Sequence, residues 1–303
     1  MAVFWVVLCV LAALGVVAGI WGIGIERHLR VIRREPIAVP VLPPGSKPIR
    51  ILHFSDIHAA PWQKAKLRWV SRLANLDVDL VVDTGDNLGH ASAIDSVLGA
   101  LRPLGKFAGV FVNGSNDYFA PHFRNPLTYF SGPSKRISET PLDTAKLVSG
   151  FEGFGWKNLN NAGAVVEING VRLGFVGTDD HHEHRSDLTS IAKSVDGLGP
   201  VDALIGVTHA PYLSVIEAMQ NAGTEVLFAG HTHGGQVCLP FFGAIVTNCD
   251  LPRHAAKGLT RWESAKGFMW LNVCAGLGHS IFAPVRFFCR PEVRLVALVA
   301  AAA

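Results

Sequence analysis

The chain has 303 residues, of which 49% are hydrophobic and 17% are charged, and its formal net charge is +3 at pH 7. A charge this mild gives no reason to expect a nucleic-acid partner. The five cysteines have no close pair, which argues against a disulfide framework and against a cysteine-based zinc site. Most of the length therefore fits one α/β domain with a sizeable hydrophobic core.

The N-terminal segment is predicted to be a membrane anchor. Residues 1–25 contain no charged side chain, and a helix of that length, at about 1.5 Å per residue, can cross the hydrocarbon core. Trp5 and Trp21 lie near its two ends, where indole rings favour the interface. Positive charge follows this run instead of preceding it, and no cleavage site is obvious, so we predict a retained anchor rather than a signal peptide.

Four arginines follow the anchor closely: Arg27, Arg30, Arg33 and Arg34. The positive-inside rule then predicts a single-pass protein of the cell membrane whose main domain lies in the cytoplasm. Residues 35–48 contain five prolines, a composition typical of an extended linker. We therefore predict a basic juxtamembrane segment and proline-rich linker at 26–48, and one domain at 49–303.

Within that domain the hydrophobic pattern alternates between short strands and helices. Two apolar runs flank Asn169-Gly170, which is a strong hairpin signal. Ser92 is the predicted N-cap of one helix. This alternation, followed by a hairpin, predicts mixed sheets covered by helices. The predicted strands are 49–54, 79–83, 109–113, 164–168, 171–176, 203–208, 225–229, 269–274 and 293–299, and the predicted helices are 64–75, 92–101 and 212–222.

Polar clusters follow the main apolar strands, and they carry the functional signal. Because ligand groups at the carboxyl ends of strands converge on one crevice of an open α/β sheet, side chains far apart in the sequence can meet there. Mixed imidazole and carboxylate donors suit Mn, Fe, Zn, Co or Ni better than Ca or Mg alone. The clusters are Asp56-Ile57-His58, Gly85-Asp86-Asn87, Asn113 to Asp117, Thr208-His209 and Gly230-His231-Thr232-His233.

In this order, the clusters resemble the calcineurin-like metallophosphoesterase superfamily, whose motifs are DxH, GDxx, GNH(D/E), a later xxH and GHxH. The long form GHTHGGQ at 230–236, together with the N-terminal anchor, is similar to the YkuE-type branch, which includes membrane-associated enzymes. The resemblance covers residues 49–299. It implies a four-layer αββα sandwich of two mixed sheets flanked by helices, preceded here by one transmembrane helix, and a centre of two divalent transition-metal ions.

The resemblance also implies a ligand set. Asp56, His58 and His233 would hold one ion, and Asp86 would bridge the two. His209 and His231 would hold the second ion together with a residue of the third motif. The residues expected to act directly in catalysis are Asp86, Asn116 and His231.

The third motif departs from the family pattern. Aligned on Gly114 and Asp117, the sequence has Ser115 at the ligand position and Asn116 where the family has histidine. Asn116 could supply its carbonyl oxygen to the second ion after a small loop shift. Alternatively, Ser115 ligates weakly and Asn116 donates to the phosphate; we favour the first. Loss of a general acid costs about 10²–10⁴-fold, so a pyrophosphate, with its good leaving group, would suffer least.

Substrate contacts are harder to assign. Arg124, Arg136 and Arg185 could each meet a phosphate, but ordinary surface charge is the alternative. Arg185 ends a polar cluster at 179–185, which is either a substrate-binding loop bordering the site or a solvated surface loop.

The sequence thus predicts a dimetal-dependent hydrolase of phosphate esters or pyrophosphates that acts through a metal-bound hydroxide. The anchor favours a substrate at the lipid bilayer, such as a phospholipid or a lipid-linked nucleotide, and no nucleic acid is expected. The alternative is a non-catalytic module that binds metal and phosphate at the membrane, for which the altered third motif is the main support.

Overall fold

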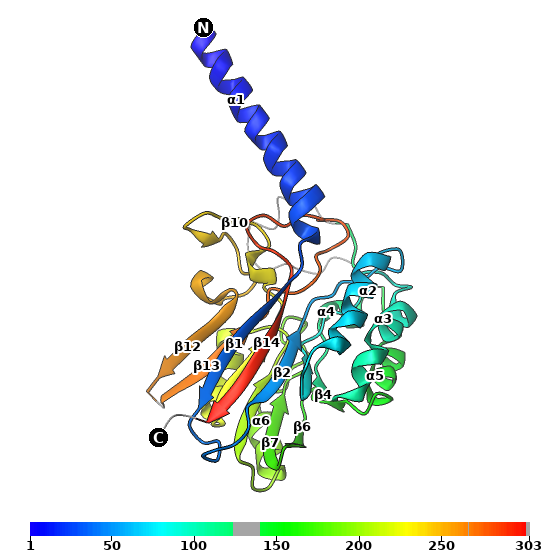
Figure 1. The fold of residues 1–303 in the computed structure, drawn as a ribbon, viewed down its shortest axis with the longest axis vertical. Coiled ribbons are helices and arrows are strands. Elements are labelled where there is room, and N and C mark those ends of the chain that lie inside the picture. The colour runs from blue at the N-terminus through cyan, green and yellow to red at the C-terminus, as the bar shows by residue number, and fades with distance from the viewer. Residues whose placement is uncertain (124–139, 266, 301–303) are drawn as a thin grey trace.

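The computed structural model describes residues 1–123, 140–265 and 267–300. One long helix projects from a domain in which two sheets pack face to face between layers of helices (Figure 1). Each main sheet has six strands. The first runs in the order β1 (Val31–Val39), β14 (Glu292–Ala300), β2 (Ile49–Phe54), β3 (Leu80–Asp83), β4 (Ala108–Phe111), β5 (Lys157–Asn158).

The second sheet also combines parallel and antiparallel pairs. A separate two-stranded hairpin consists of β10 (Cys238–Leu239) and β11 (Gly243–Ala244). The strand order of the second sheet is β12 (Gly258–Ser264), β13 (Gly267–Val273), β9 (Val226–Ala229), β8 (Ala203–Val207), β7 (Val171–Gly177), β6 (Gly163–Ile168).

Helices cover the outer face of each sheet, so the domain has four layers in the order αββα. On the first sheet these are α2 (Lys64–Arg72), α3 (Ile94–Leu101) and α5 (Thr144–Glu152), and on the second they are α6 (Ser190–Gly197) and α7 (Leu213–Asn221). The single turn α4 (Ser115–Tyr118) follows β4. The predicted fold class is therefore confirmed.

The strands are hydrophobic on both faces because both faces are buried. In β2, Ile49 and Ile51 pack between the two sheets, whereas Leu52 and Phe54 pack against the helices. The side chains of β9 divide in the same way between the central core and the core under α7. Alternation along a strand sends successive side chains to opposite faces, so near-continuous apolar runs are needed here.

Each predicted strand and helix has a counterpart in the structure, with small shifts at its ends. The prediction that Ser92 is a helix N-cap is wrong. Helix α3 begins at Ile94 after Ala93, and the hydroxyl of Ser92 instead lies 2.8 Å from Nδ1 of His90. The sequence did not predict α5, α6 or β12. No residue of strand β12 is fully buried, so it lacks the buried alternation by which a strand is recognised.

The predicted linker at 26–48 is wrong for residues 31–39, which form β1. This strand pairs in parallel with β14 over its full length. Ile37 and Val39 are each 1% exposed and pack in the core between the sheets. Pro36 suggested a linker, but a proline can occupy an edge strand, where its missing N–H removes no hydrogen bond to a neighbouring strand.

The N-terminal helix is the one described segment that is long and apolar enough to cross a membrane. Its α-helical part α1 (Ala2–Gly19) continues as a π-helical turn (Ile20–Ile25) and a 3-10 turn (Glu26–His28). Mean hydropathy reaches 2.8, and none of the most apolar window is buried in the domain. The helix thus extends slightly beyond the predicted boundary at residue 25, and the chain is a membrane protein.

If β1 is part of the core, removing its buried side chain must destabilise the whole domain. We expect Ile37→Ala to lower the free energy of unfolding by about 2–5 kcal/mol, because it leaves a cavity between the sheets. The midpoint of urea unfolding of the full chain in detergent micelles measures this change. Ala38→Ser, at the exposed neighbouring position, is the control; an equally small effect of both variants would contradict the role of β1.

Candidate metal centre

The candidate ligands lie on short loops directly after strands β2, β3 and β9, in an unusual backbone conformation. Asp56, His58, Asp86, His231 and His233 all have positive φ, between 40° and 67°. This region is sparsely populated by residues other than glycine. Such conformations persist only where the surroundings over-determine them, and they cluster at functional sites.

These loops bring imidazole and carboxylate atoms together from distant parts of the sequence. Nε2 of His58 lies 3.3 Å from Oδ2 of Asp86, and Nε2 of His209 lies 3.6 Å from the same oxygen. Nε2 of His233 lies 3.7 Å from Oδ1 of Asp56. Two groups could each hold a metal ion: Asp56, His58 and His233, and Asp56, Asp86 and His209.

The atoms that face this centre fit metal ions because they lack other partners. Among the described residues, Oδ1 of Asp56 and Nε2 of both His58 and His209 are buried without a hydrogen bond. A buried polar atom without a partner is unfavourable and calls for an explanation. Coordination of cations in the two groups would satisfy these atoms.

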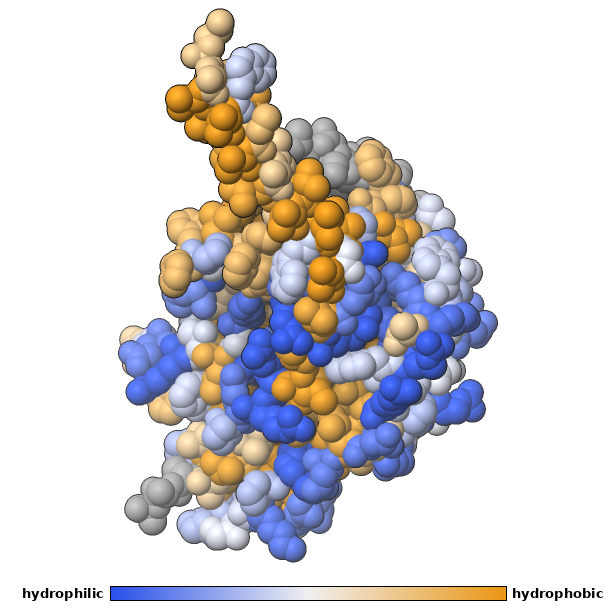
Figure 2. Space-filling view, turned by 45° about the horizontal axis from the view of Figure 1, so that its top comes forward, coloured by the Kyte–Doolittle hydropathy of each residue, from blue (hydrophilic) through white to orange (hydrophobic). Residues whose placement is uncertain are grey.

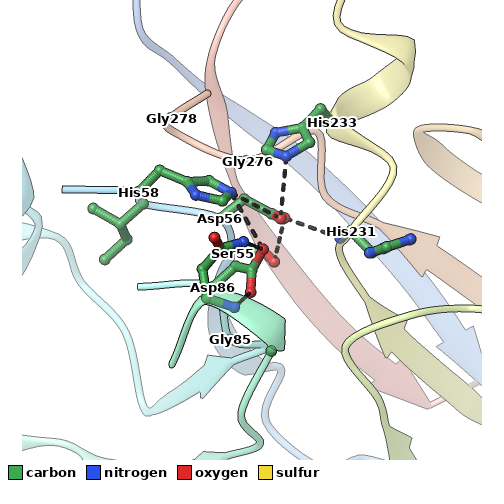
Figure 3. A network of polar contacts seen from close by, with 12 residues as sticks. Ser55, Asp56, His58, Gly85, Asp86, His231, His233, Gly276 and Gly278 are labelled. Carbon is green, nitrogen blue, oxygen red and sulfur yellow. Dashed lines mark hydrogen bonds and ion pairs between the residues drawn. The ribbon is translucent and has the colours of Figure 1, made fainter. Parts of the chain in front are cut away.

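Neighbouring groups orient the ligands. Oδ2 of Asp56 accepts hydrogen bonds from Oγ of Ser55 at 2.6 Å and from the backbone N–H of His231 at 3.0 Å, which leaves Oδ1 directed at the centre. Nδ1 of His209 lies 2.7 Å from the carbonyl oxygen of Thr84. A bond at one ring nitrogen fixes the tautomer and presents the other to a metal. In Figure 3 the rings of His58 and His233 point toward the carboxylate of Asp56.

The charges of the centre are strongly coupled. Burial would raise the pKa of Asp56 and Asp86, but the surrounding histidines hold the pKa of both carboxyls below its usual range. Burial would likewise lower the pKa of His209, yet the carboxylates of Asp86, Asp56 and Asp180 raise it to about 9. For His233, burial prevails over the attraction of Asp56 and lowers the pKa to about 3. The carboxylates of Asp56 and Asp86 therefore stay ionised, which favours a cation at the centre.

The third motif forms α4, and the side chains of Asn116 and Asp117 contact Asp86. Asn116 donates from its backbone N–H to Oδ1 of Asp86 and from Nδ2 to Oδ2, each at 2.7 Å. Ser115 instead donates its hydroxyl to Asp180 at 2.5 Å. The carboxylate of Asp117 accepts backbone N–H groups of Gly114 and of the loop that contains Asp86, and burial, followed by the charge of Asp86, raises the pKa of Asp117 to about 6.

His231 lies beside the centre but in neither of the two groups. Its ring centroid is 5.2 Å from that of His209, and its Nε2 is 3.2 Å from the carbonyl oxygen of Asn248. Nδ1 is thus the atom that could reach an ion near His209. Burial, together with the charges of His182 and His209, lowers the pKa of the His231 ring.

The polar cluster at 179–185 borders the centre. Asp180 is fully buried, and the ring of His182 lies 4.8 Å from that of His231, centroid to centroid. Arg185 lies 3.5 Å from Asp179 and stacks over the ring of Tyr118 at 3.9 Å. The other two predicted substrate contacts, Arg124 and Arg136, lie outside the described residues.

Arg286 is a neighbour of the centre that the sequence did not reveal, because no motif surrounds it. Its side chain is fully buried, and its Nη1 donates to the carbonyl oxygen of His233 at 3.1 Å. Gly230 was seen only as part of a motif, but its role is steric: a Cβ there would collide with the side chain of Ser55. This close approach lets β9 lie against the loop of Asp56.

Comparison with known proteins agrees with this geometry. The sequence model of calcineurin-like phosphoesterases matches residues 49–235. The chain is 27% identical to the metallophosphoesterase YkuE of Bacillus subtilis, covering 90% of this chain and 87% of that protein. It is 25% identical to YkoQ of the same organism, covering 82% and 83%.

A third relative is UDP-2,3-diacylglucosamine pyrophosphatase LpxG of Chlamydia muridarum, which is 26% identical and covers 94% of each chain. The alignments with these relatives therefore cover most of the length of this chain. The motif order, the two ligand groups and the family match lead to one conclusion. The chain belongs to the calcineurin-like phosphoesterase family, in its YkuE-like branch, and is a metal-dependent phosphohydrolase.

Proposed function

We propose that this membrane protein hydrolyses a phosphate ester or a diphosphate carried by a bilayer-resident molecule, using two divalent transition-metal ions. The observation that carries the proposal is the pair of ligand groups that share Asp56, in which buried ligand atoms lack any partner among the described residues. Mixed imidazole and carboxylate donors favour Mn, Fe, Zn, Co or Ni. When bound, such ions would polarise the phosphoryl oxygens and acidify a water molecule.

In this proposal the residues divide into two ligand sets. Asp86 would bridge, because histidines from two different loops already approach one of its oxygens. Asn116 lies against both oxygens of Asp86, and rotation of its amide would present the carbonyl oxygen to an ion in the same place. Asp56, His58 and His233 would hold the first ion, and His209, His231 and Asn116 the second.

The absence of histidine at position 116 bears on the substrate. No imidazole stands there to protonate the leaving group, and the amide of Asn116 can only donate a hydrogen bond. A diphosphate needs such protonation least, because its leaving group is a stable phosphate. The name of the relative LpxG describes a pyrophosphatase of a diacylated nucleotide sugar, which supports a lipid-linked diphosphate as the substrate class of this protein.

The basic flank of the anchor supports a cytoplasmic domain, because arginines accumulate on the cytoplasmic side of single-span proteins. A lipid substrate would then be taken from the inner leaflet. Arg185 would contribute to the substrate-side surface, where its guanidinium is held over Tyr118.

A non-catalytic metal-binding module is the second candidate, favoured only by the altered third motif. The two candidates differ in turnover. We expect the full chain in detergent, stripped by a chelator and reloaded with Mn, Fe, Co, Ni or Zn, to hydrolyse aryl phosphates or lipid diphosphates. Metal binding without turnover of any ester or diphosphate would support the module instead.

Asp86→Asn tests the bridging carboxylate. Because the amide cannot bridge two cations, we expect activity to fall by more than about 100-fold, beyond the effect typical of residues that only support a ligand. Metal content per protein, measured by mass spectrometry, should fall as well. Asp95→Asn, in the exposed carboxylate that pairs with Lys146, is the matched control and should retain both properties.

Asn116→Ala and Ser115→Ala distinguish the two interpretations of the third motif, in which either Asn116 or Ser115 is the metal ligand. If Asn116 is the ligand, its alanine variant should lose more than about 100-fold in affinity for the more weakly bound ion, beyond the loss typical of a residue that only supports a ligand, whereas Ser115→Ala should keep that affinity. Calorimetric titration of the stripped protein with Mn or Zn measures both. The reverse order would assign the ligand to Ser115.

A further inference from the structure

The end of the anchor helix is built into the domain next to the metal centre. Glu26 is 3% exposed, and its carboxylate accepts hydrogen bonds from the backbone N–H groups of Phe288 at 2.9 Å and Cys289 at 2.6 Å. The indole N–H of Trp21 donates to the same carboxylate at 2.6 Å. The apolar helix therefore leaves the bilayer at a point that is fixed against the loop preceding β14.

Arg286 links that point to the candidate ligands. Its backbone N–H donates to the carbonyl oxygen of Gly22 in the anchor at 3.1 Å, and its side chain donates to the carbonyl oxygen of His233 at 3.1 Å. A Cβ at Gly22 would come within 3.0 Å of the backbone of Arg286. Since a single residue contacts both the anchor and the loop of His233, the metal centre lies close to the base of the anchor.

Large apolar side chains are exposed around this attachment point. Phe241 is fully exposed, and Phe242 and Phe288 are each 54% exposed. Their segments are joined, because the N–H of Cys238 donates to the carbonyl oxygen of Phe287 at 2.8 Å. We call the following exposed side chains the apolar collar: Leu239, Phe241, Phe242, Phe282 and Phe288.

Figure 2 shows apolar surface that continues from the anchor onto the part of the domain around its base. Contiguous exposed apolar patches of this kind mark contact with another protein or with a membrane. The backbone of Phe288 is bonded to Glu26, so this part of the collar sits at the depth where the apolar run ends. A lipid surface is therefore the partner that the anchor itself brings to the collar.

Positive charge lies between the anchor and the metal centre. Lys66 is 4% exposed, and its Nζ donates to the carbonyl oxygens of Ile57 at 2.8 Å and His58 at 3.0 Å. Arg27 and Arg30 each bury Nε without a partner among the described residues. These cations complement an anionic headgroup.

We propose that the apolar collar inserts into the leaflet around the anchor, so that the metal centre meets the headgroup layer directly and an anionic phosphorylated lipid reaches it from within the bilayer. The reaction assigned to that lipid rests on the proposed function, but the membrane contact of the collar does not. A water-soluble phosphate ester would use the same centre without help from the collar.

The membrane contact of the apolar collar can be tested without an activity assay, by measuring how deeply the collar lies in the bilayer. A nitroxide is placed by Phe241→Cys in a Cys9→Ser background of the full chain, reconstituted into vesicles of phosphatidylcholine and phosphatidylglycerol. We expect oxygen, which concentrates in lipid, to relax this label more than a water-soluble paramagnetic chelate does. Phe268→Cys, near the β12–β13 turn remote from the anchor (Figure 1), is the matched control and should show the opposite order. Equal accessibility to the chelate at both positions would overturn the proposal.

Activity then tests substrate delivery. In Phe241→Ser/Phe242→Ser we expect hydrolysis of a lipid diphosphate in vesicles to fall about tenfold or more, because membrane insertion scales with buried apolar area. Hydrolysis of a soluble aryl phosphate should remain unchanged, as should both activities in Phe268→Ser. An equal fall on both substrates would refute delivery through the collar. If the unmodified protein hydrolysed neither substrate, the proposed function would be wrong. The nitroxide measurement would still show whether the apolar collar contacts the membrane.

Discussion

The metal centre depends on imidazole and carboxylate atoms that are buried close together and have no hydrogen-bond partner in the described part of the chain. Burying such atoms unpaired is unfavourable, so the surrounding fold must hold them in place. It does so through hydrogen bonds to the opposite side of each ligand, as with Oδ2 of Asp56 and Nδ1 of His209. The site is thereby preorganised for cations, which would replace mutual repulsion with coordination.

The same constraint explains the sandwich around it. Both sheets are buried on two faces, which makes their strands rigid supports for the loops at their ends. Loops from β2 and β3 in one sheet meet loops from β8 and β9 in the other, so the centre bridges the two sheets. Strained residues such as His231 and His233 can persist there because the packed core determines their backbone.

The anchor is part of this arrangement and does not act as a flexible tether. Glu26 and Gly22 contact the loop that contains Arg286, and Arg286 supports the loop of His233. Strand β1, which follows the anchor, is paired along the edge of the first sheet. The direction in which the anchor leaves the domain is therefore set by hydrogen bonds at Gly22 and Glu26 and by the pairing of β1.

The sequence by itself determined the mixed sheets covered by helices, the main strands, the apolar N-terminal helix and the order of the ligand motifs, because these follow from local periodicity and from residues adjacent along the chain. The four-layer arrangement was implied by the resemblance of those motifs to a known family. Only the tertiary structure decided the role of residues 31–39, since an edge strand with Pro36 has no local signature distinct from a linker. It also decided the partners of Ser115 and the position of Arg286. Those depend on contacts between segments far apart in the chain, which no local pattern encodes.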